Sequence, residues 1–343
     1  MRFKNIPVII FFPWAVYALS CSRPAAAQTE FVMGTVCSVN LYEGGSRGLY
    51  AAVFSRLREI DRAMNANGEE GAGESEVARI NRNAGKEPVR VSGDLIAVLD
   101  RALRYAELSG GGFDPTVGPL VKLWGIGTER ERVPPAEEIT AALALVNWRD
   151  VRIDHQGGTV FLTKPGMAID LGAIAKGYAA DETGALVKKA GLDRGIIDLG
   201  GNILALGSRP GAGPWRIGIQ DPERERGTYL GVLPVRDKSV VTSGVYERYF
   251  ESGGRRYHHI LSTGDGYPVD NGLLAVTIMA DFSIDADSLS TSVFTLGYEK
   301  GRALVESIPG AEAIFVFADK SIRGTQGAME IFSLASGQYR IED

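Results

Sequence analysis

The apolar residues of this chain change their spacing along the sequence. From Leu49 to Met64 they recur every three or four positions, which predicts an amphipathic helix. A second helix is predicted from a Ser92 cap to the glycines at 110–112. The run Phe31–Tyr42, which precedes both, is typical of a strand. The first part of the chain is therefore predicted to mix strand and helix.

The remaining elements follow the same mixed pattern. A third helix is predicted after the prolines at 134 and 135, and a fourth over Gly172–Ala190, with Gly191 as its C-terminal stop. The Gly- and Glu-rich stretch Asn65–Ser75 is predicted to be an exposed loop. Short strands and glycine turns alternate elsewhere, without a repeat of 20 to 50 residues. Because the strands cluster instead of alternating strictly with helices, we predict an α+β fold.

Size and composition are those of an ordinary folded enzyme. The 343 residues are 45% hydrophobic and 23% charged, which suits one large domain or two lobes that share a core. A core of that size needs no metal to hold it together, so a bound metal is expected to be functional. The net charge of −5 and the absence of a long Lys/Arg run argue against nucleic acid as a partner.

The N-terminus carries the features of a secretory signal. Arg2 and Lys4 precede an uncharged apolar stretch, Ile6–Leu19, which is too short to span a bilayer. Residues 1–27 are therefore predicted to direct export, with cleavage after Ala27. Lipidation of Cys21 is the alternative, because the residues before it resemble a bacterial lipobox. The protein is expected to be periplasmic, or anchored to the membrane as a lipoprotein.

Two segments combine an aspartate with residues that suit phosphate and a cation. Asp287 and Thr291 lie four positions apart in a predicted helix, so their carboxylate and hydroxyl share a face and offer the oxygen ligands that Mg²⁺ prefers. A strand-like run reaches Asp170, and Lys176 follows after small residues that let the backbone approach a ligand. Each aspartate alone is equally typical of a helix cap, and the pattern leaves both interpretations open.

Histidine offers a candidate base but no zinc site. The three histidines, at 155, 258 and 259, include no pair with helical metal-binding spacing. Walker A and Gly-x-Gly-x-x-Gly motifs are absent from the sequence, so the common nucleotide folds are not supported. His258 and His259 precede a glycine-rich turn, where a histidine with a pKa near neutrality can act as general base toward a hydroxyl. A structural, hydrogen-bonded histidine is the alternative.

A series of short motifs resembles the FAD:protein FMN transferases, the ApbE-like flavin transferase family, over essentially the whole mature chain. In chain order the motifs are Met33-Gly34-Thr35, Ser75–Asn81, Gly112–Val121, Asp170–Tyr178, Asp198–Asn202, Thr242-Ser243-Gly244, His259-Ile260 and Ala286–Thr291. The shared order makes the resemblance specific.

The resemblance implies a two-lobed, T-fold-like flavin transferase domain over residues 28–343, with antiparallel-rich sheets, flanking helices and FAD in the cleft. The residues implied to contact FAD are Met33, Gly112, Phe113, Asp114, Asp170, Lys176 and Ile260. The residues implied to hold Mg²⁺ are Ala173, through its backbone oxygen, Asp287, Ser290 and Thr291. Lys176 and His259 are expected to be catalytic, the first by neutralising charge on the pyrophosphate and the second as the base.

The implied activity is transfer of FMN from FAD to a threonine hydroxyl of a partner protein, typically a subunit of a membrane redox complex, with release of AMP. Two departures leave alternatives open. The family's turn Asp-Pro-x-Thr-Gly-Tyr-Pro is here Ser262–Pro268, and the loop near Asn67 lacks an aromatic residue that many members offer to FAD. A more open site would admit water. An FAD pyrophosphatase and a non-catalytic flavin-binding surface protein are therefore the alternatives.

Overall fold

The computed structural model describes residues 27–42, 44–66, 73–211 and 213–342. The predicted apolar signal stretch and Cys21 lie outside these residues, as does the loop position Asn67. Within the described ranges, no helix combines the length and apolar character that crossing a membrane requires.

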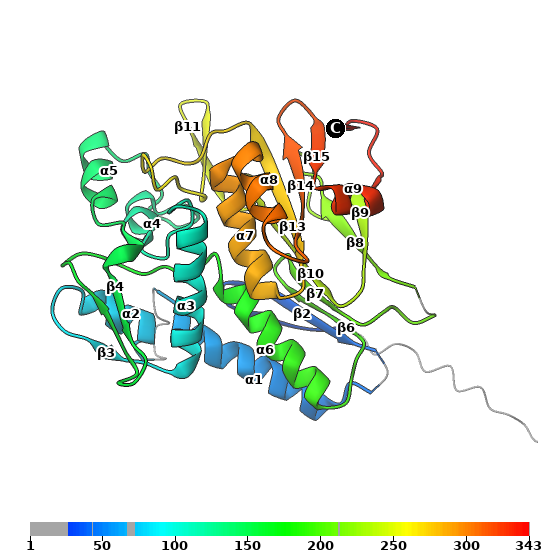
Figure 1. Ribbon diagram of the computed structural model, residues 1–343, viewed down its shortest axis with the longest axis horizontal. Helices are drawn as coiled ribbons and strands as arrows, with labels where there is room; N and C mark the ends of the chain where they lie inside the picture. Colours follow the sequence, from blue (N-terminus) through cyan, green and yellow to red (C-terminus); the bar gives the residue numbers. More distant parts are fainter. Residues whose placement is uncertain (1–26, 43, 67–72, 212, 343) are drawn as a thin grey trace, which may run out of the picture.

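Helices and strands are intermixed along the chain (Figure 1). The helices are α1 (Arg47–Met64), α2 (Glu76–Arg82), α3 (Gly93–Leu108), α4 (Gly118–Trp124), α5 (Ala136–Leu143), α6 (Ala175–Lys189), α7 (Ser283–Leu296), α8 (Tyr298–Glu306) and α9 (Gln326–Ile331), and a 3₁₀ turn covers Trp148–Asp150. The strands are β1 (Gln28–Val32), β2 (Thr35–Leu41), β3 (Val89–Arg90), β4 (Val151–Asp154), β5 (Thr159–Leu162), β6 (Gly195–Leu199), β7 (Asn202–Leu206), β8 (Trp215–Gln220), β9 (Tyr229–Val235), β10 (Lys238–Gly244), β11 (Tyr249–Ser252), β12 (Arg255–His258), β13 (Leu273–Ala280), β14 (Glu312–Phe317), β15 (Ser321–Gly324), β16 (Ser333–Leu334) and β17 (Arg340–Ile341).

One large sheet organises the molecule. Within the described residues it has nine strands in the order β1-β2-β6-β7-β10-β13-β14-β15-β17, antiparallel except for the last pair. Helices α1, α6 and α7 cover one face (Figure 1), while the small sheet β16-β9-β8 packs its apolar side chains against the other. The sheet β3-β5-β4 and helices α2 to α5 form a flanking lobe. This arrangement confirms the predicted α+β class with antiparallel-rich sheets.

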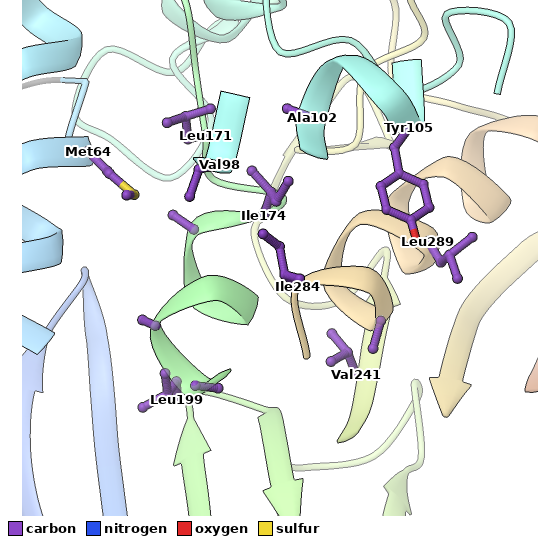
Figure 2. Close-up of a cluster of buried hydrophobic side chains, with 14 of the residues drawn as sticks. Met64, Val98, Ala102, Tyr105, Leu171, Ile174, Leu199, Val241, Ile284 and Leu289 are labelled. Carbon is purple, nitrogen blue, oxygen red and sulfur yellow. The ribbon is translucent and has the colours of Figure 1, made fainter. Parts of the chain in front are cut away.

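The main core lies where helices from both lobes meet the sheet. Figure 2 shows Val98 and Tyr105 of α3 together with Leu289 of α7, while Leu199 of β6 and Val241 of β10 approach from the sheet. All five side chains are buried. Apolar contacts of this kind fix α7 between the sheet and the flanking lobe, and so fix the polar residues that α7 carries.

Several predicted boundaries are confirmed by the structure. Helix α1 ends at Met64 and α3 begins after Ser92, whose hydroxyl accepts a hydrogen bond from the N–H of Leu95 at 3.3 Å. Helix α5 follows the proline pair at 134 and 135. Apolar periodicity and caps are local signals, which is why they were sufficient here.

The first predicted strand is wrong as a single element. Residues Phe31–Tyr42 contain the end of β1, a tight turn and β2, and the two strands pair as an antiparallel hairpin. At the turn Met33 has a φ of 55° and Gly34 a φ of 69°. A turn with one glycine between two apolar arms gives almost no break in the hydrophobic pattern, so the sequence did not reveal it.

The structure excludes the alternative in which the two aspartates cap helices. Helix α7 begins at Ser283, so Asp287 lies in its second turn. Helix α6 begins at Ala175 instead of Gly172, with Ile174 as its N-cap. The strand-like run before Asp170 is irregular apart from an isolated bridge at Ala168. Neither aspartate caps its helix, which leaves both carboxylates for other contacts.

Candidate active site

The predicted site residues gather around one cleft of about 600 Å³. Its lining includes Met33, Gly112, Phe113, Asp114, Asp170, Ala173, Lys176, His259, Ile260, Asp287 and Thr291. Ser290 lies behind this lining with its side chain fully buried. A more open depression of about 920 Å³ lies beyond the turn at 110–114 and includes neither Lys176 nor Asp287 in its lining. We therefore place the candidate active site in the smaller cleft.

Helices α6 and α7 cross closely at the base of the cleft. A Cβ on Gly177 would lie 2.4 Å from the carbonyl oxygen of Ser283 and 2.6 Å from the Cα of Ile284, so no larger residue fits. The N–H of Gly177 donates to Oδ2 of Asp287 at 2.8 Å. Asp181 accepts from the N–H groups of Ser283 and Ile284 at 2.8 and 2.9 Å, which satisfies the first turn of α7. The crossing thus fixes Asp287 against α6.

The Asp287 carboxylate is only 4% exposed. Burial raises its pKa, and the Lys176 ammonium and the hydrogen bond from Gly177 oppose that rise. An ionised carboxylate in such surroundings is stable only beside positive charge. The site therefore favours a cation next to Asp287.

A chain of hydroxyl groups orients Thr291. The hydroxyl of Ser290 donates to the carbonyl of Asp287 at 2.8 Å. It can therefore only accept from the hydroxyl of Ser243, which lies 2.8 Å away. The hydroxyl of Thr291 lies 3.4 Å from that of Ser243 and can then act only as a donor to it. The remaining lone pairs of Thr291 are left for a ligand in the cleft.

Asp170 and Lys176 reach the cleft from the segment that leads into α6. The side chain of Asn81 bonds both the N–H and the carbonyl of Ile169, at 2.6 and 3.0 Å, and this holds the irregular segment in place. Oδ1 of Asp170 accepts from the N–H of Gly172 at 2.8 Å. Lys176 lies in the first turn of α6, so its ammonium and the positive end of the helix both favour an anion.

The β1–β2 turn forms one wall. Met33 has a left-handed backbone conformation that is uncommon for a residue other than glycine. Its N–H donates to Oδ2 of Asp61 at 2.8 Å, and Asp61 of α1 also lines the cleft. This bond stabilises the strained turn and fixes Met33 at the cleft.

The opposite wall is the turn after α3. Oδ1 of Asp114 accepts from the N–H and the hydroxyl of Thr116 at 2.8 and 2.7 Å, and Oδ2 accepts from the N–H of Trp148 at 2.9 Å. Burial raises the pKa of Asp114, against these hydrogen bonds. Because both carboxylate oxygens of Asp114 accept hydrogen bonds from the protein itself, this side chain stabilises the turn. Contact with a ligand at this wall would then come from the backbone around Gly112.

The altered turn Ser262–Pro268 keeps its shape through contacts of its own. The hydroxyl of Ser262 accepts from the N–H groups of Gly264 and Asp265 at 3.2 and 3.3 Å. Thr263 lines the cleft and donates to the carbonyl of Gly111 at 2.6 Å. The serine thus organises the turn, and the threonine joins the turn to the wall formed by residues 110–114.

The two adjacent histidines have different surroundings. His258 is 6% exposed, and its Nε2 lies 2.9 Å from the carbonyl of Val269. His259 lines the cleft, and its Nδ1 lies 3.2 Å from the carbonyl of Arg248. A ring nitrogen next to a carbonyl must carry the proton, so Nε2 of His259 is the free basic nitrogen. His258 is the structural member of the pair.

The cleft lowers the pKa of His259 to about 3, mainly by desolvation and secondly through the Arg248 guanidinium, with smaller effects of His258 and Lys176. The ring of His259 remains partly accessible from the cleft. The imidazole is neutral at physiological pH and able to accept a proton. A bound pyrophosphate would offset the positive charges and strengthen it as a base.

Sequence patterns gave no individual role to several polar residues of the cleft. Arg226, Glu247 and Arg248 line it, as does Asn202. The first three lie in charged stretches that are typical of solvated surface. The side-chain amide of Asn202 is buried and acts on the Asp287 carboxylate, where it opposes the rise of the pKa. Asn202 thus helps to keep Asp287 ionised.

Together the fold and the cleft define a class: an α+β protein whose cleft suits a phosphate-bearing ligand and a divalent cation. The particular family follows from comparison, because the model of the ApbE family matches residues 33–315. The chain belongs to the ApbE family. The predicted family membership is thereby confirmed.

Relatives and solved structures agree with this assignment. The chain is 40% identical to the FAD:protein FMN transferase of Treponema pallidum (strain Nichols), with 92% of this chain and 91% of the relative covered. It is 37% identical to that of Klebsiella pneumoniae (strain 342), with 92% and 97% covered. The crystal structure of the ApbE protein of Thermotoga maritima gives a TM-score of 0.81 at 32% identity, with 89% of this chain and 98% of that chain covered.

Proposed function

We propose that this protein transfers the FMN moiety of FAD to a threonine hydroxyl of an acceptor protein and releases AMP. The observation that carries the proposal is the convergence, in one cleft, of every residue predicted to contact FAD or the metal except Ser290. The naming of similar full-length relatives as FAD:protein FMN transferases supports the same reaction.

The donor set fits Mg²⁺. Asp287 would supply a carboxylate, Thr291 a hydroxyl and Ala173 its backbone carbonyl, since all three residues line the cleft. In the described ranges, no group of three or more His, Cys, Asp or Glu side chains competes as a metal site. Mixed oxygen donors with one carboxylate suit Mg²⁺ that also binds substrate phosphates. Bound there, the ion would neutralise charge on the pyrophosphate.

The protein's own groups account for the chemical step. The threonine oxygen attacks the phosphorus on the FMN side of the pyrophosphate, in line with the bridging oxygen. A new P–O bond to threonine forms, the bond to the AMP phosphate breaks, and Nε2 of His259 takes the hydroxyl proton. Lys176 and the N-terminus of α6 stabilise the negative charge that develops on the phosphates.

The acceptor and the location are part of the proposal. A membrane redox-complex subunit is the kind of acceptor that the family resemblance implies. Residues 1–27 support export to the periplasm, with lipid anchoring at Cys21 as the alternative to cleavage. A mass spectrum of the mature protein distinguishes the two N-termini.

The test is incubation of the purified protein with FAD, Mg²⁺ and a threonine-bearing acceptor domain, followed by in-gel flavin fluorescence and measurement of AMP. Covalent fluorescence that is lost when the acceptor threonine is replaced by valine supports transfer. FMN and AMP without labelled acceptor indicate a pyrophosphatase. Unchanged FAD would contradict both the transferase and the pyrophosphatase activity. The remaining alternative would be a non-catalytic flavin-binding protein.

A further inference from the structure

An apolar pair is exposed beside the cleft. Phe31 and Val36 are opposite each other in the β1–β2 hairpin, and they are 76% and 59% exposed. The residues between them include Met33, Gly34 and Thr35, which line the cleft. The pair therefore lies at the cleft mouth. Neighbouring apolar side chains with this exposure mark a candidate contact surface.

The strand register shows which face of the sheet the pair occupies. Phe31 is opposite Val36, and Ser38, two residues further along β2, is opposite Asp198 of β6. Directly opposed residues share a face, as do residues two apart in one strand. The intervening Cys37 belongs to the core under α1. Phe31, Val36 and Asp198 thus lie on the face that α1 and α6 leave uncovered.

Arg226 lines the same cleft as the turn residues Met33, Gly34 and Thr35. Its charge acts on Asp198 and Glu247, whose pKa values desolvation raises and Arg226 lowers. Lys176 acts on Glu247 and Asp287. Lys176, Arg226 and Glu247 all line the cleft whose wall includes the turn between Phe31 and Val36. Within the described part of the chain, the guanidinium of Arg226 has no ion-pair or hydrogen-bond partner, so it is available to a ligand.

The loop that carries Arg226 is held in shape although it is exposed. The side-chain amide of Gln220 makes hydrogen bonds of 2.8 to 3.3 Å to four backbone groups of residues 221–227. At the base of the loop, Asp221 accepts from the hydroxyl of Tyr339 at 2.7 Å. A loop ordered before binding loses less conformational entropy when its arginine engages a partner.

We propose that Phe31, Val36 and Arg226 form an acceptor-docking surface, which binds a segment of the acceptor protein with an apolar side chain and a carboxylate beside the accepting threonine. This inference rests on the proposed function, which requires a polypeptide to enter the cleft from outside. Arginine is enriched among the residues that carry most of the binding energy at protein interfaces. The guanidinium fork matches a carboxylate in geometry and charge.

The test uses an array of synthetic threonine peptides whose flanking residues are apolar, acidic or basic, offered with FAD and Mg²⁺. Wild-type protein should label most strongly the peptides that combine an apolar and an acidic flank. Arg226→Glu should shift the preference to basic flanks. For the best peptide, Phe31→Ser with Val36→Ser should raise KM about tenfold or more and leave KM for FAD within about twofold.

Matched controls separate docking from folding. Thr29→Ala changes an exposed residue on the same hairpin face, farther from the turn, and should leave KM for the peptide unchanged. Labelling without flank preference, or a preference that Arg226→Glu does not change, would overturn the docking surface while leaving the transferase intact. Formation of FMN and AMP without any labelled peptide would instead contradict the proposed transferase function. It would contradict the docking surface as well, because that surface presupposes transfer.

Two other occupants of this surface have their own readouts. If the face binds a second copy of this chain, the wild type sediments as a dimer and Phe31→Ser as a monomer. It is a membrane contact if binding to phosphatidylglycerol vesicles is lost in the variant. Either result, with unchanged KM for the peptide, would contradict acceptor docking.

Discussion

The backbone N–H of Gly177 donates a 2.8 Å hydrogen bond to the carboxylate of Asp287, although the two residues are 110 positions apart in the sequence. This bond joins the segment of Asp170 and Lys176 to the segment of Asp287 and Thr291. Each segment alone is ambiguous, and their contact makes one site that suits pyrophosphate and a cation.

Replacement of Asp287 by asparagine tests the metal assignment. Asparagine keeps an acceptor for the N–H of Gly177 but loses the charge that holds a cation, so kcat/KM should fall by about 10²- to 10³-fold. Steady-state kinetics over a range of Mg²⁺ concentrations measures the loss. An unchanged melting curve serves as the control for folding, and full activity in this variant would exclude Asp287 as a metal ligand.

Gly177→Ala tests the helix crossing. The added methyl group would collide with the backbone of α7, which should destabilise the protein by about 1 to 3 kcal/mol in urea unfolding. Gly93→Ala is the matched control, because nothing lies within 4 Å of its Cβ position in the first turn of α3. Alanine there should be neutral or mildly stabilising. Equal stability of the two variants would show that the crossing tolerates a side chain.

His259→Ala is expected to lower kcat by about 10²- to 10⁴-fold, the usual range for loss of a general base. His258→Gln should instead reduce stability, because that ring is buried and bonded to the carbonyl of Val269. Single-turnover rates and urea unfolding distinguish the two effects. A loss below about threefold in His259→Ala would show that another residue is the base.

The pKa of His259 offers an independent check that needs no substrate. Desolvation and Arg248 lower it to about 3, with a smaller contribution from Lys176. NMR titration should therefore find it well below 6.5, and Lys176→Met should raise it. Because the unfolded state binds this proton more tightly, the histidine costs stability as pH falls below 6.5 toward the folded pKa. A normal pKa in the free protein would contradict the described surroundings.

Features that depend on residues close together in the sequence could be predicted, and features that depend on tertiary packing could not. Caps and apolar periodicity identified α1 and α3, and the order of motifs identified the family and the cleft residues. The turn at Met33 was missed because one glycine barely interrupts an apolar run. Arg226 was missed because its relation to Asp198 arises from a loop of a different sheet. Contacts of that kind depend on tertiary packing, which local spacing does not encode.

The most direct test of the central claim is a single-turnover reaction of the protein with FAD, Mg²⁺ and acceptor, in which AMP and acceptor-bound flavin are counted together. Transfer to a threonine hydroxyl predicts one AMP for each flavin attached, with the flavin on the threonine in a peptide mass spectrum. AMP in excess over attached flavin, with free FMN making up the difference, would contradict transfer and establish hydrolysis of FAD.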